Sequence, residues 1–172
     1  MQVLLSSNQL NDLILDLANS LHKSHNDQKD VVYVGIQQGG AVLGSKIVAE
    51  LEKLDDNKKV QYGQLDITFY RDDIRKEILT PDTMNLPFEI EGKTVVLIDD
   101  VLFTGRTIKA ALNVLLDYGR PAKVELCVLI DRKEHRQFPI QADYVGKAVG
   151  SKMEEKIKLF DDQVILLSPT SH

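Results

Sequence analysis

The sequence lacks the features that mark secreted and membrane-spanning proteins. It contains one cysteine, Cys127, in 172 residues, so an internal disulfide bond is excluded. No apolar run is long enough to cross a bilayer, and the first residues lack the basic, apolar and small-residue segments of a secretory leader. We therefore expect a cytoplasmic protein with no membrane partner.

An excess of positive charge is also missing. The chain has 21 lysines and arginines against 26 acidic residues, and this net charge of −5 does not indicate a general nucleic-acid binder. Basic side chains do gather in the last third of the chain, at Arg132, Lys133, His135, Arg136, Lys147, Lys152, Lys156 and Lys158. They are either solvated side chains balanced by Glu134, Glu154 and Glu155, or one face of a local RNA-binding surface.

Repeats, low-complexity tracts and linkers are absent too, and 43% hydrophobic residues suffice for one domain, residues 1–172, with a sizeable core. Apolar strand patterns, such as Val31 to Ile36 and Lys123 to Ile130, alternate with amphipathic helical patterns. The first helix is expected after Ser6 or Ser7. This alternation predicts an α/β fold with a mostly parallel central sheet flanked by helices, and a site at the carboxyl ends of the strands.

Two further residue types have ordinary expected roles. Cys127 lies inside an apolar strand pattern, which favours a small core residue over a nucleophile. His22 and His25 fall at the polar end of the first helix, so we expect them to be solvated rather than to bind a metal.

The most informative stretch is Val95 to Thr107. Four apolar strand-forming residues lead into Asp99 and Asp100, and a Thr-Gly-Arg-Thr turn then opens the amphipathic run Ile108 to Leu116. Backbone amides at the start of such a helix form a seat for phosphate, and two acids can hold polyol hydroxyls or a hydrated divalent cation. The alternative is ordinary loop chemistry, with Thr104 or Thr107 as the helix N-cap.

A nucleotide hydrolase with a Walker B strand is disfavoured. That strand also ends in acids, but it needs a Walker A partner. The nearest candidate, Gly39 to Lys46, has its serine and lysine in the wrong order.

Val95 to Thr107 is similar to the 5-phosphoribosyl-1-pyrophosphate (PRPP) signature of type I phosphoribosyltransferases. Four more segments, residues 65–73, 118–121, 129–132 and 143–147, resemble the PyrR family in order and spacing. That family comprises bifunctional pyrimidine operon attenuators with uracil phosphoribosyltransferase activity. The resemblance implies the type I phosphoribosyltransferase fold, with a flexible lid loop at about residues 71–86 and a small hood.

The resemblance also implies the reaction of uracil with PRPP to give UMP and pyrophosphate, with Mg²⁺ carried by PRPP. Asp99 and Asp100 would contact the ribose hydroxyls close to the metal and favour positive charge developing on the sugar. Arg71 would add positive charge on pyrophosphate when the lid closes. The other contacts to PRPP or nucleotide are assigned to Gln38, Gly39, Gly40, Phe103, Thr104, Gly105, Arg106, Thr107 and Arg132.

The sequence departs from the family pattern after the first sheet strand. The family usually has Thr-Arg-Gly there, whereas this chain has Gln38-Gly39-Gly40, so a glycine replaces the arginine. Glycines still permit an unusual turn, and they leave backbone amides uncovered so that these can bind an anion. The fixed positive charge is missing.

Two functions of different classes remain. One is a uracil phosphoribosyltransferase of pyrimidine salvage. The alternative is a UMP-sensing attenuation protein with weak or no catalysis, which binds an mRNA leader through Lys133, Arg136, Lys147 and Lys152. A phosphoribosyltransferase for a purine is less favoured, because the similarity outside the PRPP motif follows PyrR. The resemblance implies a homodimer or a higher homo-oligomer.

Overall fold

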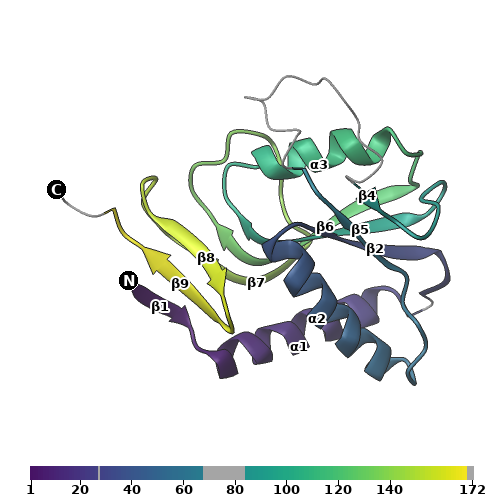
Figure 1. Ribbon diagram of the computed structural model, residues 1–172, viewed down its shortest axis with the longest axis horizontal. Helices are drawn as coiled ribbons and strands as arrows, with labels where there is room; N and C mark the ends of the chain where they lie inside the picture. The colour runs from purple at the N-terminus through teal and green to yellow at the C-terminus, as the bar shows by residue number, and fades with distance from the viewer. Residues whose placement is uncertain (27, 68–83, 170–172) are drawn as a thin grey trace.

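The computed structural model of the chain describes residues 1–26, 28–67 and 84–169, which form a six-stranded sheet, three α-helices and a smaller three-stranded sheet (Figure 1). The larger sheet has the order β4-β3-β2-β5-β6-β7. Its strands are β2 (Val31–Ile36), β3 (Tyr62–Leu65), β4 (Met84–Asn85), β5 (Thr94–Leu102), β6 (Lys123–Arg132) and β7 (Tyr144–Val149). All neighbours pair in parallel except β4, which runs antiparallel to β3.

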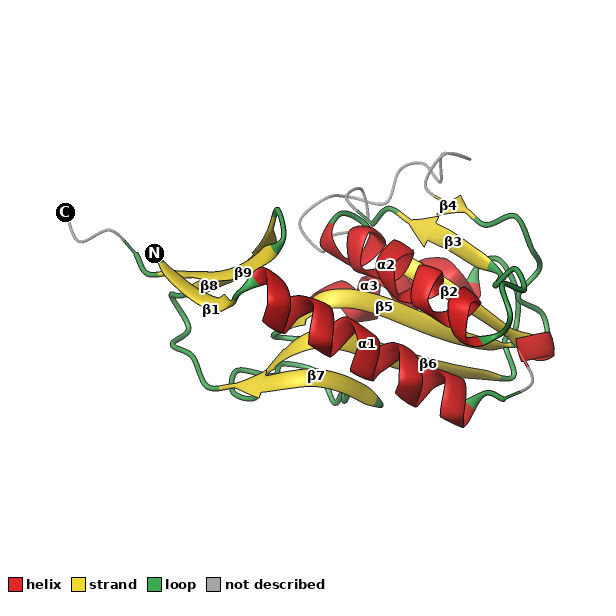
Figure 2. Ribbon diagram, turned by 90° about the horizontal axis from the view of Figure 1, so that it is seen from below, coloured by secondary structure: helices red, strands yellow, loops and turns green. Residues whose placement is uncertain are grey.

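Helices cover both faces of this sheet. The helices α1 (Ser7–Ser24) and α2 (Gly39–Leu54) pack on one face, and α3 (Arg106–Leu116) packs on the other (Figure 2). Successive residues of β5 alternate between the two cores: Val96 and Ile98 join the core under α1 and α2, whereas Val95 and Leu97 join the core under α3. The predicted α/β fold, with a mostly parallel sheet flanked by helices, is therefore confirmed, and both faces of the central strands are buried.

The first helix begins where its sequence indicates. Ser6 is the N-cap of α1, because its hydroxyl accepts the N–H of Gln9 at 3.3 Å and the Gln9 side chain accepts the N–H of Ser6 at 2.9 Å. This reciprocal pair is a capping box. The face that α1 buries consists of Leu10, Ile14, Leu17, Ala18 and Leu21.

The smaller sheet is the predicted hood. It has the antiparallel order β1-β9-β8, formed by β1 (Gln2–Leu5), β8 (Lys156–Phe160) and β9 (Gln163–Leu167). It lies beyond the carboxyl ends of the parallel strands (Figure 2). Ile157 and Val164 turn inward and join the core under α1 and α2.

Two expectations for single residues had opposite outcomes. Cys127 is fully buried in β6, as predicted. The expectation that His25 is solvated is wrong, because its Nε2 lies 2.6 Å from Oε1 of buried Glu125 and only 15% of its side chain is exposed. Glu125 lies a hundred residues further along the chain, so the sequence pattern gave no sign of this pair.

The sequence from Val60 to Tyr70 has the alternation expected of a strand, but β3 covers only Tyr62–Leu65, and residues 68–70 lie outside the described residues. Of the predicted loop 71–86, Met84–Asn85 form β4. Residues 71–83, including Arg71, lie outside the described residues. No helix in the described ranges has the length and apolar character to cross a membrane.

Candidate active site at the carboxyl edge of the sheet

Strand β5 carries the two acids of the PRPP motif. Asp99 is buried, with 6% of its surface exposed, and Asp100 is half-buried. The Asp99 carboxylate accepts the N–H of Asp100 at 2.9 Å, and the Asp100 carboxylate accepts the N–H of Val101 at 2.9 Å. Strand β5 continues to Leu102, so the two acids lie near the carboxyl end of the strand and not after its last residue.

Burial and the adjacent negative charge control the ionisation of Asp99. Removal from water and then the charge of Asp100 raise the pKa of Asp99 well above its usual range, and the N–H bond from Asp100 opposes this only in part. A cation or a developing positive charge beside Asp99 would favour its charged form. The pair is therefore suited to interact with a positively charged partner.

The turn that follows β5, residues 103–107, is named here the phosphate turn. Gly105 has a φ of 91°, in the left-handed region that favours glycine, and it is the N-cap of α3. The cap makes no side-chain hydrogen bond, although the Thr104 hydroxyl accepts the N–H of Arg106 at 3.3 Å. The alternative that Thr104 or Thr107 is the N-cap is therefore wrong, although the Thr104 hydroxyl lies over the first amide of the helix.

Asp99 and the phosphate turn share one hollow. It has a volume of about 40 Å³ and is lined by Asp99, Val101, Leu102, Phe103, Thr104, Gly105, Thr107 and Ile108. An anion seated on the amides that begin α3 would therefore lie beside a carboxylate. This arrangement suits a ligand that carries both a phosphate and hydroxyl groups.

The Gln38-Gly39-Gly40 turn packs against the same two acids. It follows β2 directly and contains a cis peptide between Gln37 and Gln38. A β-carbon on Gly40 would lie 2.9 Å from Cα of Asp99, and one on Gly39 would overlap the Asp100 carboxylate. These two glycines thus let the start of α2 approach the acids, and the structure brings together the turns after β2 and β5.

Arg132, the last residue of β6, lies against the phosphate turn. Its guanidinium carbon is 3.7 Å from the centre of the Phe103 ring. Only 3% of Arg132 is exposed, and it donates hydrogen bonds to the Ser151 hydroxyl at 2.6 Å and to the Lys152 carbonyl at 2.7 Å. Burial lowers the pKa of Arg132, against the charges of Glu155 and Glu134.

The connection from β6 to β7 also touches the phosphate turn, which the sequence did not indicate. Arg136 donates to the Phe103 carbonyl and forms an ion pair with Asp131 at 2.7 Å. The N–H of Gln137 donates to the Thr104 carbonyl at 2.8 Å. The structure therefore places Arg136, a candidate RNA contact, in a half-buried position beside the phosphate turn.

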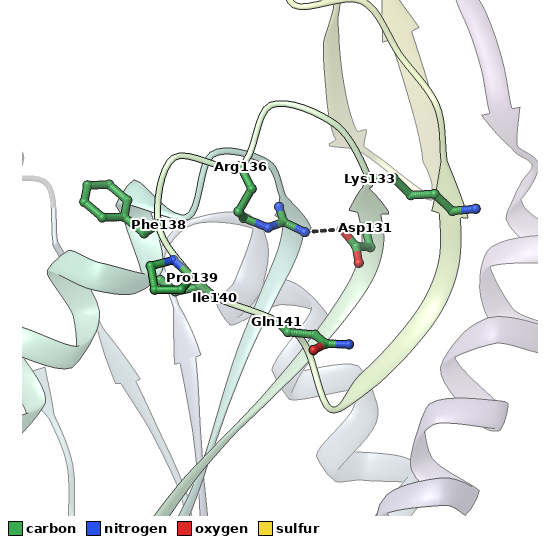
Figure 3. A pocket seen from close by; sticks show the side chains of 7 residues that line it. All are labelled: Asp131, Lys133, Arg136, Phe138, Pro139, Ile140 and Gln141. Atoms are coloured by element: carbon green, nitrogen blue, oxygen red, sulfur yellow. Dashed lines mark hydrogen bonds and ion pairs between the residues drawn. The ribbon is translucent and has the colours of Figure 1, made fainter.

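A larger hollow of about 470 Å³ lies beside this connection (Figure 3). Figure 3 shows the Arg136 guanidinium turned toward Asp131 and the Lys133 side chain pointing away from both. The other lining residues are Phe138, Pro139, Ile140 and Gln141.

The remaining candidate RNA contacts are exposed but lie among acids. Lys133, Lys147 and Lys152 are exposed on or after β6, β7 and the connection to β8. Glu134 accepts the N–H of Ser151 at 3.2 Å, and Glu155 accepts the N–H of Lys152 at 2.8 Å. Acidic groups thus interleave the basic ones, which favours the interpretation of locally balanced charge.

No group of three or more His, Cys, Asp or Glu side chains that suits a metal ion is found within residues 1–26, 28–67 and 84–169. Asp99 and Asp100 offer two carboxylates. This fits a hydrated divalent cation that arrives with its ligand better than one held by the protein alone.

Comparison with known proteins assigns the family. A phosphoribosyl transferase domain matches residues 4–164. A curated "Bifunctional protein PyrR" of Roseiflexus sp. is 46% identical over 90% of this chain and 84% of its own length. Another, of Ligilactobacillus salivarius, is 48% identical over 78% of this chain and 77% of its own length. The chain belongs to the PyrR family of phosphoribosyltransferases.

Solved structures agree with this PyrR-family fold. A hypoxanthine phosphoribosyltransferase of Staphylococcus aureus is 27% identical, with a TM-score of 0.70 over 89% of this chain and 80% of that one. The hypoxanthine phosphoribosyltransferase of Trypanosoma cruzi, at 18% identity, shares the fold, with a TM-score of 0.75 over 99% of this chain and 98% of that one. The predicted type I phosphoribosyltransferase fold and the enzyme class are confirmed for this PyrR-family chain, and the nucleotide-hydrolase alternative is excluded.

Proposed function

We propose that this PyrR-family protein transfers the 5-phosphoribosyl group of PRPP to uracil and releases UMP and pyrophosphate. The observation that carries this proposal is the single hollow shared by buried Asp99 and the phosphate turn. PRPP has a 5-phosphate and two ribose hydroxyls, so one ligand could contact both the phosphate turn and the neighbouring carboxylate. Uracil as the acceptor follows from the resemblance to PyrR proteins.

In this proposal the 5-phosphate binds to the amides of Thr104, Gly105, Arg106 and Thr107 at the start of α3. Asp99 and Asp100 accept hydrogen bonds from the ribose hydroxyls. As the bond from the anomeric carbon to pyrophosphate breaks and the bond to uracil nitrogen forms, positive charge develops on the sugar, and the two carboxylates stabilise it. Uracil gives the proton of that nitrogen to solvent water.

Pyrophosphate would lie against the backbone of Gln38, Gly39 and Gly40, where bare amides replace the missing arginine. Arg71, which lies outside the described residues, would supply positive charge from the loop. Mg²⁺ carried by PRPP would offset charge on the departing pyrophosphate, and the carboxylates of Asp99 and Asp100 would accept hydrogen bonds from its bound waters.

The test is a PRPP assay with uracil, orotate, adenine and hypoxanthine in parallel. We expect turnover with uracil, and loss of turnover in the double variant Asp99→Asn, Asp100→Asn with its fold retained. Asp117→Asn, at an exposed position after α3, is the control for removal of an acid. Turnover with a purine instead, or a near wild-type rate in the double variant, would overturn the proposal. Activity with none of the four bases would favour the regulator.

We also propose that any RNA leader binds through Lys133, Lys147 and Lys152 and not through Arg136, because Arg136 is paired with Asp131. The triple variant of these lysines to glutamine should lower the affinity for a pyrimidine-gene leader and flatten its salt dependence. Unchanged RNA affinity in that variant contradicts this assignment. We further propose a cytoplasmic homodimer or larger homo-oligomer, which light scattering tests.

A further inference from the structure

Arg132 contacts two segments that are far apart in the chain. The face of its guanidinium lies on the Phe103 ring of the phosphate turn, while Nε and Nη2 donate to Ser151 and Lys152. The parallel register of β5 and β6 explains the first contact, because Leu102 pairs with Asp131 and the next residues therefore lie side by side. Residues 151 and 152 belong to the connection between β7 and hood strand β8.

This buried guanidinium forms no ion pair among the described residues. Its hydrogen bonds go to a hydroxyl and a carbonyl, and Glu155 and Glu134 act on it only through their charges at longer range. Removing a charged guanidinium from water costs free energy unless hydrogen bonds and other contacts in the protein replace its contacts with water. Only a planar group offers a face for an aromatic ring and an edge of donors at the same time, so lysine cannot replace both contacts.

The main chain of the phosphate turn is held independently of Arg132. Arg136 binds the Phe103 carbonyl, and the Gln137 N–H binds the Thr104 carbonyl. His135 adds an edge contact to the Phe103 ring, with 5.7 Å between ring centres. The connection after β6 thus fixes the backbone of the turn, and the Phe103 ring links the turn, through Arg132, to the hood connection.

We infer that Arg132 is a positioning residue that couples the hood connection, residues 150–152, to the phosphate turn, so that the affinity for PRPP depends on where the hood lies. This inference rests on the proposed binding of the 5-phosphate at that turn. Arg132 acts through Phe103, and the coupling needs the aromatic ring and the guanidinium together.

The first test compares Arg132→Lys with Arg120→Lys. Arg120 is an exposed arginine just before the amino end of β6, so this control makes the same change at the end of the strand away from the site. For Arg132→Lys we expect the KM for PRPP to rise about tenfold, since a cation–π contact and a charged hydrogen bond are lost, while kcat and the KM for uracil change much less. Arg120→Lys should leave all three unchanged. A role confined to folding would lower the amount of active enzyme without this selective rise in KM, and an unchanged KM for PRPP would overturn the inference.

The conservative variant at the partner ring sharpens the test. Phe103→Tyr keeps the aromatic face, so the KM for PRPP should rise less than it does in Phe103→Leu. Phe103→Leu removes that face and should reproduce the effect of Arg132→Lys. Equal effects of the tyrosine and leucine variants contradict the inference.

A double-mutant cycle measures the coupling directly. Ser151→Ala and Phe103→Leu change opposite ends of the bridge and do not need Arg132 to be altered. We expect their effects on PRPP affinity to be non-additive, and to become additive when Arg132→Lys is also present. Additivity in the wild-type background overturns the inference, even where Arg132→Lys itself fails to fold.

Failure of the proposed uracil reaction is distinguishable from failure of the coupling. Calorimetric titration with PRPP and Mg²⁺ reads the affinity of each variant without turnover. Absence of uracil transfer in the wild-type protein would refute the proposed reaction, while the PRPP affinities would still decide whether Arg132 couples the two segments.

Discussion

Gly39 and the Asp100 carboxylate occupy adjoining space at the carboxyl edge of the sheet, so closely that a β-carbon on Gly39 would overlap that carboxylate. Gly39 is the first residue of α2, and Asp100 lies in β5. The N-terminal, positive end of the α2 dipole therefore faces an acid of the PRPP motif, and this position stabilises the negative charge of the carboxylate. The contact requires a residue without a side chain.

Gly39→Ala should therefore reduce catalysis by displacing Asp100. We expect kcat/KM to fall by about tenfold to a hundredfold, because small misplacements of a catalytic group cost rates of that order. The control is Val42→Ala, an exposed position of the same helix, where we expect no change. Steady-state kinetics with PRPP and uracil measures both. Gly39→Arg, which brings in the arginine usual in the family, should also lose activity. A gain would show that the Asp100 side chain moves aside freely.

Asp99→Asn should make the protein more stable while it lowers activity. The pKa of Asp99 is raised by burial and by the charge of Asp100, so at neutral pH the folded state binds this proton more tightly than the unfolded chain does. This costs stability as the pH rises above the unfolded value of about 3.9. Asparagine has no such cost and still accepts the Asp100 N–H.

Urea unfolding at several pH values measures this effect. We expect Asp99→Asn to unfold at a higher urea concentration than wild type at pH 7, because burial and the charge of Asp100 disfavour the charged form of Asp99 in the folded state. The gain should vanish below about pH 4, where both states of the wild type are protonated. Asp117→Asn is the control, and a variant that is less stable at pH 7 than wild type contradicts the argument.

His25→Ala should destabilise the fold by about 2 kcal/mol, since it removes the closest partner of a buried carboxylate. Burial alone would raise the pKa of Glu125, but the hydrogen bond from His25 and the nearby Lys123 lower it overall. This contribution is present above the unfolded value of about 4.3 and is lost as the pH falls through the lower folded value. Tyr144 also donates to the same carboxylate at 3.3 Å and would remain.

Thermal unfolding of His25→Ala at pH 7 and pH 3.5 tests this pair, with His22→Ala in the same helix turn as the matched control. The destabilisation should be large at pH 7 and small at pH 3.5 for His25→Ala, and below about 0.5 kcal/mol at both for the control. Equal effects of the two substitutions would mean that the contact between His25 and Glu125 adds nothing to stability.

The Cys127 thiol should resist modification in the folded protein. It is fully buried, and burial raises its pKa to about 12, so almost no thiolate exists at neutral pH. A colorimetric disulfide reagent at pH 8 should label less than a tenth of the chains in the time that labels the urea-unfolded chain completely. Fast labelling of the folded protein would mean that β6 opens readily.

The sequence predicted those parts of the site that lie on one continuous segment. From Thr94 to Leu116 the strand, the two acids, the glycine turn and the helix follow one another, and each is determined by local pattern. The N-cap was the exception, because Gly105 at a positive φ takes the place that a threonine was expected to fill.

Contacts across the fold were not predictable in the same way. Arg132 reaches Phe103 because β5 and β6 are neighbours in parallel register, and His25 reaches Glu125 because α1 ends near the start of β6. Both pairs depend on packing between elements that are distant in the sequence. In the sequence, Arg136 and Lys133 belong to the same basic cluster. In the fold, Arg136 pairs with Asp131, whereas Lys133 is exposed.

The hood also bears on how the protein is synthesised. Gln2 pairs with Leu166 and Val3 with Ile165, so β1 has no partner strand until β9 has emerged from the ribosome. The parallel strands β2, β3, β5 and β6 can pair earlier, because all of them precede the hood strands β8 and β9 in the chain. During translation the two acids and the phosphate turn therefore leave the ribosome before the strands that complete the hood.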